Sequence, residues 1–235
     1  MENIKDDRGF NQVWGDSKST RIRAERRCDY MISQMEISPQ KSIMEIGCGT
    51  GKNCFMLAQK TGMKVLGTDL CVPFIDDAKK NFQLPNLRFD ILDFNKADQF
   101  KGEKFDYIIG NGILHHLYHH LDDAFVNMKA LLKENGKIIF LEPNIYNPYV
   151  YLIFSYASLR VKAHLEPDEM AFSKNFATEK LLKAGYRNIQ VEYKDFLLPG
   201  IPDALIAPSV ITGDVLEKIP LVKMVSQSIF ISASK

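Results

Sequence analysis

The sequence predicts an α/β fold in which helices cover both faces of a doubly wound, mostly parallel sheet. Short apolar strands alternate with amphipathic helices from about residue 41 onward, a pattern typical of parallel strands joined by helical crossovers. A glycine-rich turn follows the first of these strands, and Asp69 ends the second. Both features lie where such sheets bind ligands, beyond the carboxyl ends of the strands.

Apolar spacing places the repeated strand–helix units. We expect strands, in chain order, at residues 41–46, 64–68, 87–92, 105–110 and 137–141. We expect helices between them at residues 53–60, 73–82 and 117–132. Pro73 suits the first turn of a helix, and Gly136 is placed to end the longest one.

Further elements are expected on both sides of this region. An apolar stripe predicts an N-terminal helix over residues 17–36. Residues 145–172 show no clear strand–helix unit, and an apolar, proline-containing stretch covers 196–219. A helix at 178–184 and strands at 188–193 and 228–232 complete the expected elements. We interpret residues 1–235 as one domain, with a helical segment at 1–40, a ligand-binding core at 41–144, and a small cap inserted at 145–172 and 194–224.

Composition and charge exclude several classes of protein. Hydrophobic residues make up 46% and charged residues 25% of the chain, which excludes long disorder and fibrous repeats. Thirty Lys+Arg against 29 Asp+Glu leave a net charge of +1, so a dedicated nucleic-acid binder is not expected. No secretory signal or membrane span is predicted, and the four cysteines lack C-x-x-C spacing. We therefore expect a cytoplasmic protein with reduced thiols.

The strongest chemical signal is the turn that follows the first strand. Gly47, Gly49 and Gly51 alternate there, and glycine lets a backbone turn sharply and lets a ligand lie against it. Asp69 could accept hydrogen bonds from a ribose diol, so together these residues predict a cofactor that contains a nucleoside. A dinucleotide fingerprint would need glycine at position 52, where this chain has Lys52. NAD is therefore the less favoured alternative.

The segment Glu45-Ile46-Gly47-Cys48-Gly49-Thr50-Gly51 resembles the first motif of class I S-adenosylmethionine (SAM)-dependent methyltransferases. The similarity continues over about residues 40–144, through Thr68-Asp69, Leu92-Asp93-Phe94, the stretch from Phe105 to His116, and the stretch from Leu131 to Pro143. A looser match covers 170–193. The chain departs from the family at Glu134-Asn135-Gly136, a surface turn where many members have Pro-Gly-Gly.

The resemblance implies a seven-stranded sheet whose last strand is antiparallel, with SAM as cofactor and S-adenosylhomocysteine as product. It implies that Asp69 binds the ribose, that Asp93 and Phe94 meet the adenine, and that Asn111 lies beside the methionine part. Asp93 is preferred to Asp90 because it ends its strand, where ligands bind. The full set of cofactor-binding residues implied is Glu45, Gly47, Cys48, Gly49, Asp69, Leu70, Asp93, Phe94 and Asn111.

Three residues near the N-terminus are candidates for closing the cofactor site. Arg23 and Arg27 lie one turn apart on the expected first helix and could clamp the SAM carboxylate. The alternative is a solvated basic face. Trp14 could close over the cofactor.

Histidines supply the candidate catalytic residues. Methyl transfer to a hydroxyl usually requires a general base near the acceptor, and we select His116 and His164, with Glu142 as a further candidate. Four histidines, His115, His116, His119 and His120, form two pairs at the i, i+4 spacing of helical metal ligands. No cysteine or carboxylate clearly completes a set, so no metal is expected.

The resulting prediction is an enzyme that transfers a methyl group to an O or N atom of a small-molecule acceptor of natural-product, sugar or lipid-linked type. Aromatic residues between 146 and 159 and apolar residues between 196 and 219 could line an acceptor pocket, dock on lipid or form a homodimer interface. The alternatives are a peptide or protein methyltransferase, and a non-catalytic SAM-binding regulatory subunit.

Overall fold

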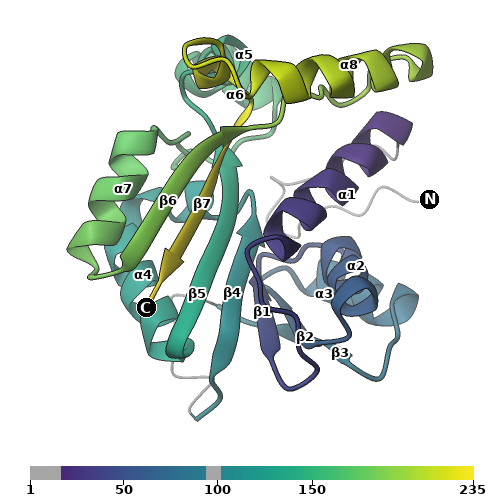
Figure 1. The fold of residues 1–235 in the computed structure, drawn as a ribbon, viewed down its shortest axis with the longest axis vertical. Helices are drawn as coiled ribbons and strands as arrows, with labels where there is room; N and C mark the ends of the chain where they lie inside the picture. Colours follow the sequence, from purple (N-terminus) through teal and green to yellow (C-terminus); the bar gives the residue numbers. More distant parts are fainter. Residues whose placement is uncertain (1–16, 94–101) are drawn as a thin grey trace.

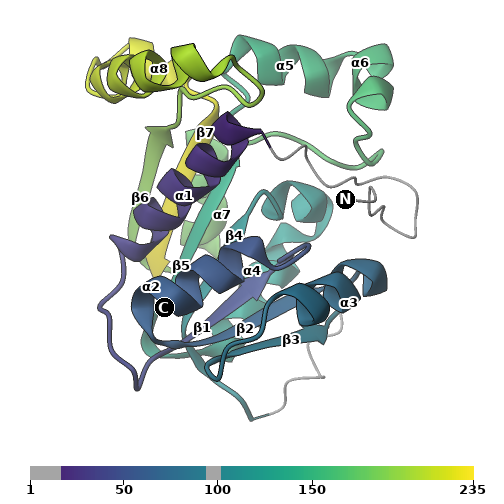
Figure 2. The same ribbon diagram turned by 90° about the vertical axis from the view of Figure 1, so that its right-hand side faces the viewer.

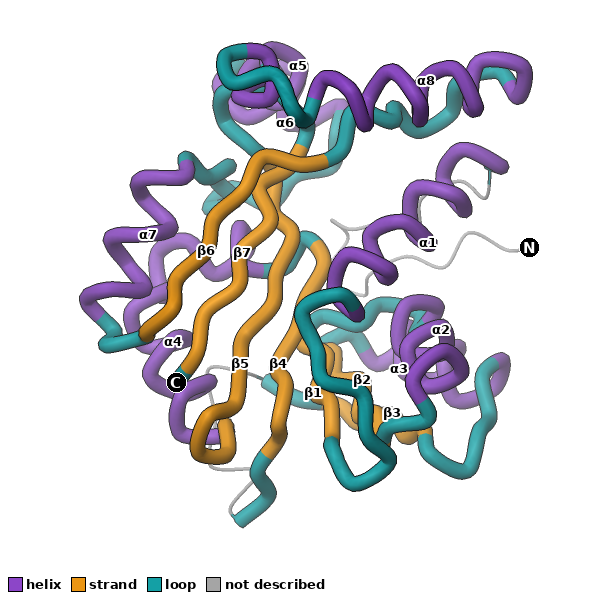
Figure 3. Tube along the Cα trace, in the orientation of Figure 1, coloured by secondary structure: helices purple, strands orange, loops and turns teal. Residues whose placement is uncertain are grey.

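Seven strands form a single sheet in the order β3-β2-β1-β4-β5-β7-β6 (Figure 3). The computed structural model describes residues 17–93 and 102–235. β7 runs antiparallel to both of its neighbours, whereas β1 to β5 pair in parallel. The predicted fold class, including the antiparallel last strand, is thereby confirmed. The strands are β1 (Ser42–Ile46), β2 (Lys64–Asp69), β3 (Leu87–Ile91), β4 (Phe105–Asn111), β5 (Leu132–Pro143), β6 (Arg187–Lys194) and β7 (Ser228–Ser234).

Helices cover both faces of this sheet. Figure 1 shows α1, α2 and α3 on one face and α4 and α7 on the other. The helices are α1 (Lys18–Ile32), α2 (Lys52–Thr61), α3 (Val72–Asn81), α4 (Leu121–Leu131), α5 (Pro148–Ser155), α6 (Ala157–Lys162), α7 (Lys174–Lys183) and α8 (Asp203–Leu216). The described residues also include the 3-10 helices η2 (Leu114–His120) and η3 (Val222–Val225).

Two layers of apolar side chains hold these helices to the sheet. On one face, Cys28 of α1, Leu57 of α2 and Ile75 of α3 are completely buried. On the other face, Phe125 of α4 and Leu181 of α7 are buried. Removing a side chain of this kind from water stabilises the fold by roughly 1.5–3 kcal/mol. The helical spacing seen in the sequence is therefore the spacing of residues that face the sheet.

The longest expected helix differs from the prediction at both ends. Residues 114–120 form the 3-10 helix η2, and α4 ends at Leu131 instead of reaching Gly136. Leu132 pairs with Phe105, and the β4–β5 register then shifts before Tyr107 meets Lys137. Gly136 lies inside this irregular strand segment, where a Cβ would approach the carbonyl oxygen of Asp106 to 3.1 Å. A side chain at this position would be tightly packed against the backbone, and the prediction that Gly136 ends the helix was wrong.

Three helices form a cap beyond the carboxyl ends of the parallel strands. α5 and α6 follow β5, and α8 precedes β7, so all three lie at the same edge of the sheet (Figures 1 and 2). Sequence patterning did not reveal these helices. α8 contains Pro208 and buries only Ile206 and Gly213, so it lacks the apolar stripe of a core helix. Within the described ranges, no helix combines the length and apolar character needed to cross a bilayer.

A buried carboxylate, Asp195, attaches α1 to the chain that follows the edge strand β6. Asp195, which follows β6 and is 5% exposed, accepts hydrogen bonds from Nε of Arg23 at 2.7 Å and Nε of Arg27 at 2.8 Å. Burial alone would raise the pKa of Asp195, but the two guanidinium groups outweigh it and lower that pKa. Asp195 also accepts the backbone N–H of Leu197. One carboxylate therefore joins α1, β6 and the chain that leads to α8.

We expect Asp195→Ala to lower the free energy of unfolding by about 3–5 kcal/mol, because it leaves two partly buried arginines without their shared counter-ion. Asp214→Ala is the matched control, since Asp214 pairs with Arg26 from α1 but is half exposed; its cost should be about 1 kcal/mol or less. Urea unfolding of both variants measures the difference. Equal losses would contradict the role given to Asp195.

Candidate active site

The glycine-rich turn joins β1 to α2 at the point where the strand order reverses. β1 lies between β2 and β4, so the carboxyl ends of β1 and β4 form the topological switch point, where sheets of this kind bind ligands. Gly47, Gly49 and Gly51 have φ angles of 64°, 53° and 80°, which glycine tolerates best. A Cβ on Gly47 would lie 2.5 Å from Ile113, whereas a Cβ on Gly49 would meet nothing within 4 Å. Gly47 thus allows Ile113 to pack against the turn, and Gly49 leaves open space beside the backbone.

Asp69 lies at the end of β2 and is directed into the same turn. Its carboxylate accepts the backbone N–H of Gly49 at 2.8 Å and that of Cys71 at 2.9 Å. A carboxylate at the end of a strand, with about four acceptor positions, is the type of group that ribose hydroxyls bind. Leu70 and Ile91, next to the ends of β2 and β3, are large apolar side chains that are nearly half exposed. A charged acceptor flanked by exposed apolar surface fits the nucleoside end of SAM.

Glu45 supports the turn from within the core. Its carboxylate is 2% exposed and accepts hydrogen bonds from Asn53 at 2.8 Å and from the Cys54 thiol at 2.7 Å, both on α2. Burial raises the pKa of Glu45 to about 7. The backbone N–H of Cys48 bonds to Thr68 at 2.9 Å, which fastens the turn to β2.

Other predicted cofactor residues lie at or just after the carboxyl ends of neighbouring strands. Asn111 ends β4, and its Oδ1 accepts a hydrogen bond from Arg27 at 2.9 Å, so α1 reaches the site. Arg23 instead binds Asp195 and Gln227. Asp93 follows β3 by two residues. Phe94 and Trp14, which the sequence also assigned to the cofactor, lie outside the described residues.

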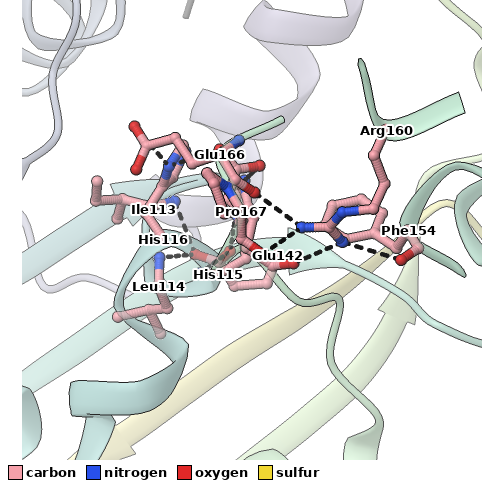
Figure 4. Close-up of polar contacts among 10 residues, drawn as sticks. Ile113, Leu114, His115, His116, Glu142, Phe154, Arg160, Glu166 and Pro167 are labelled. Atoms are coloured by element: carbon pink, nitrogen blue, oxygen red, sulfur yellow. Dashed lines mark hydrogen bonds and ion pairs between the residues drawn. The ribbon is translucent and has the colours of Figure 1, made fainter. Parts of the chain in front are cut away.

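The next part of the site is organised by Glu142, a completely buried carboxylate at the end of β5. It accepts the backbone N–H groups of Ile113, Leu114 and His115 at 3.0, 2.8 and 3.2 Å, and it contacts Nδ1 of His115 at 2.8 Å (Figure 4). Four donors surround this carboxylate. Glu142 therefore holds η2 and His115 in place, a role that leaves it poorly suited to act as a base.

His116 faces a loop from the inserted segment. Its Nδ1 lies 3.0 Å from Glu169 and 3.7 Å from Glu166. Burial alone would lower the pKa of His116, but hydrogen bonds to these two glutamates outweigh it and raise that pKa to about 9. His164, the second candidate from the sequence, is exposed in a left-handed turn after α6 and has no hydrogen bond from its side chain to a described residue.

Arg160 holds this loop in shape. Its guanidinium donates four hydrogen bonds of 2.8 to 3.0 Å to the backbone carbonyls of Phe154, Glu166, Pro167 and Glu169 (Figure 4). Sequence patterns identify none of Glu166, Glu169 and Arg160 as site residues. The only signal is the acidic run after His164. Its contact with His116 depends on the fold, which places this loop beside β5 and η2.

Glu45 provides a pH-dependent test of the site. A pKa raised from 4.5 to about 7 means that the folded state favours the protonated carboxyl, so this contribution to stability is complete below pH 4.5 and is lost as the pH rises through 7. We expect Glu45→Gln, which cannot ionise, to gain stability relative to the parent by about 2 kcal/mol between pH 5 and pH 8. Urea unfolding at both pH values measures this. A difference that stays constant with pH would contradict the raised pKa, and the exposed control Glu134→Gln should show no such trend.

Solved structures share the fold. A SAM-dependent methyltransferase from Archaeoglobus fulgidus superimposes with a TM-score of 0.63 over 90% of this chain and 94% of its own, at 16% identity. At that identity the similarity establishes the architecture alone.

Curated relatives match over parts of their length. A highly reducing polyketide synthase from Cordyceps militaris is 27% identical over 146 residues, which cover 55% of this chain but 6% of the synthase. Ribosomal protein L11 methyltransferase from Lactobacillus johnsonii is 36% identical over 104 residues, covering 42% of this chain and 30% of that protein. The chain thus spans less than a third of the length of either relative.

The family model described as methyltransferase domain matches residues 37–180, which is more than half of the chain. The match begins before β1 and extends through the Glu142 site into α7. It includes the glycine turn, Asp69, Asn111 and the His116–Glu169 contact. The chain belongs to the class I SAM-dependent methyltransferase family.

Proposed function

We propose that this chain transfers a methyl group from SAM to an O or N atom of a small-molecule acceptor. SAM supplies a methyl group already activated on a sulfonium, so the protein has mainly to align donor and acceptor. The observation that carries the proposal is that two groups of residues, a cofactor half-site and a histidine–glutamate half-site, lie at the same edge of the sheet. The glycine turn and Asp69 lie at the ends of β1 and β2, and the His116–Glu169 pair follows β4 and β5 beneath the cap.

The cofactor residues keep the roles that the family resemblance implied. In this proposal Asp69 binds the ribose, Leu70, Asp93 and Phe94 hold the adenine, and Gly47, Gly49 and Asn111 lie beside the methionine part. The hydrogen bond from Arg27 to Asn111 supports a role for α1 in closing the methionine end. Glu45 and Cys48 act indirectly by supporting the turn.

The cap supplies the acceptor side. Its segments 145–172 and 194–224 contain exposed large side chains, with Tyr149 at 63% and Tyr151 at 52% exposure on α5 and Ile211 at 67% on α8. Such a surface suits a partly apolar acceptor, such as a natural product or a lipid-linked molecule, and a second copy of the chain is the alternative cover. The local similarity to a polyketide synthase supports a natural-product type of acceptor.

His116 is preferred to His164 as the catalytic candidate at the acceptor. Because its pKa is raised to about 9, His116 could accept a proton only in the fraction that is deprotonated, so its activity should increase as the pH rises towards 9. His116 is mostly buried and is oriented by Glu169. It lies five residues after Asn111, which is proposed to contact the methionine part of SAM. His164 is exposed and is retained as the second candidate. A cytoplasmic location is part of the proposal, and the four free, buried cysteines fit a reducing compartment.

A protein acceptor is the second candidate, favoured by the similarity to ribosomal protein L11 methyltransferase. A screen with radiolabelled SAM distinguishes the two, using phenols, sugars, lipids and peptides as acceptors. Label transferred to small molecules supports the proposal, and label transferred only to peptides supports the alternative. Calorimetric SAM binding with no transfer to any class would favour a non-catalytic SAM-binding subunit.

Asp69→Ala should weaken SAM binding by about 1–3 kcal/mol, because the ribose hydroxyls would lose charged acceptors. Calorimetric titration with SAM and S-adenosylhomocysteine measures the change. Asp76→Ala, on the exposed face of α3, is the matched control and should bind as the parent does. Unchanged affinity in Asp69→Ala would refute the ribose assignment, and binding of NADH in place of SAM would refute the cofactor itself.

A further inference from the structure

We propose that His115, His116 and Glu169 form a binding site for a divalent first-row transition-metal ion at the acceptor side of the active site. The site goes beyond the proposed methyl transfer, and only its catalytic role depends on that function. Its ligands differ from the i, i+4 histidine pairs that the sequence suggested, His115 with His119 and His116 with His120. A 3-10 helix has three residues per turn, so four-residue spacing does not align side chains in η2, and His119 and His120 are exposed.

The three donors lie close enough together to share one ion. Their ligand atoms all fall within 4.8 Å of one another. Nδ1 of His116 is 3.0 Å from Glu169, and Nε2 of His115 is 3.7 Å from the other oxygen of the same carboxylate. Atoms bound to one zinc ion at about 2.0–2.2 Å lie roughly 3–3.5 Å apart in a tetrahedron, so small side-chain movements would complete the site.

Glu142 orients the first ligand. It contacts Nδ1 of His115 at 2.8 Å, and its other contacts are backbone N–H groups, which require an acceptor. The carboxylate therefore assigns the proton of a neutral His115 to Nδ1 and leaves the lone pair on Nε2, the atom that faces Glu169. A carboxylate behind a histidine ligand is the usual outer shell of protein metal sites.

The loop that carries Glu169 is held independently of any ion. Arg160 binds four of its surrounding backbone carbonyls, and the backbone N–H of Glu166 donates to Glu169 at 3.0 Å. The guanidinium of Arg160 donates its hydrogen bonds to these carbonyls and forms no ion pair with Glu169. The side chain of Glu169 is thus preorganised, as a ligand must be.

Charge balance favours a cation at this position. Glu142 and Glu169 are 0% and 1% exposed, and the ion pairs found for them among the described residues involve only His115 and His116. Buried carboxylates are costly unless they are paired or bind a metal. A divalent ion would compensate the charge of both carboxylates.

Two imidazoles and one carboxylate suit Zn²⁺ or Mn²⁺, and three protein ligands leave positions open for an acceptor oxygen. An ion there would lower the pKa of an acceptor hydroxyl. With the ion bound, His116 would serve as a ligand and not as a base, so the hydroxyl proton would pass to water. The new O–C bond would form as the S–C bond of SAM breaks, and sulfur would keep the electron pair. This chemistry selects acceptors that carry a hydroxyl group able to reach the ion.

Metal titration of the purified full chain, stripped with EDTA, tests the site without requiring activity. Co²⁺ binding is followed by its visible absorption, and Zn²⁺ affinity is measured by competition with a chromophoric chelator. We expect one equivalent to bind. His116→Gln and Glu169→Gln should each weaken binding at least tenfold, and Glu142→Gln should weaken it by about 10- to 100-fold through His115. The double variant His119→Ala/His120→Ala is the matched control and should bind as the parent does.

Less than stoichiometric binding by the parent at about 0.1 mM free Zn²⁺ or Co²⁺ would overturn the proposal. Binding that is lost in the His119→Ala/His120→Ala control but retained in Glu169→Gln would also overturn it. SAM affinity, measured by calorimetry on each variant, reports separately on folding and on the proposed function. Parent protein that binds SAM but no metal would refute this inference alone.

Discussion

The reversal of strand order between β1 and β4 is the constraint on which the rest of the structure depends. Connections leave β1 towards β2 and leave β4 towards β5, so the chain diverges at the carboxyl ends of β1 and β4, the position where sheets of this kind bind ligands. The glycine turn after β1 and Asn111 at the end of β4 therefore face each other across an open edge. The other candidate residues, from Asp69 to Glu169, are brought to that edge by an adjacent strand or by the cap.

Three buried carboxylates convert this open edge into a defined site. Glu45 ties the glycine turn to α2, Glu142 ties η2 and His115 to β5, and Asp195 ties α1 to the chain after β6. Each one accepts several hydrogen bonds, which offsets the cost of removing a carboxylate from water. Because each links segments far apart in the sequence, loss of one would disturb the site's geometry as well as its stability.

Much of the core could be predicted because local patterns determine it. Apolar spacing predicts the strands β1 to β4 and the helices that cover them. Because ligands bind at the carboxyl ends of parallel strands, those elements also place the glycine turn and Asp69. The cap could not be predicted in the same way, since α5 and α8 expose much of their apolar surface and α8 contains Pro208. The His116–Glu169 contact joins residues 53 positions apart, a distance that no local pattern encodes.

We propose that the cofactor half-site and the histidine–glutamate half-site serve one reaction. The most direct test is a crystal structure of the chain with S-adenosylhomocysteine bound. We expect the ribose at Asp69 and the sulfur between the glycine turn and η2, on the side of His116. A ligand whose sulfur points away from η2, or that binds away from the carboxyl ends of β1 and β4, would contradict this proposal.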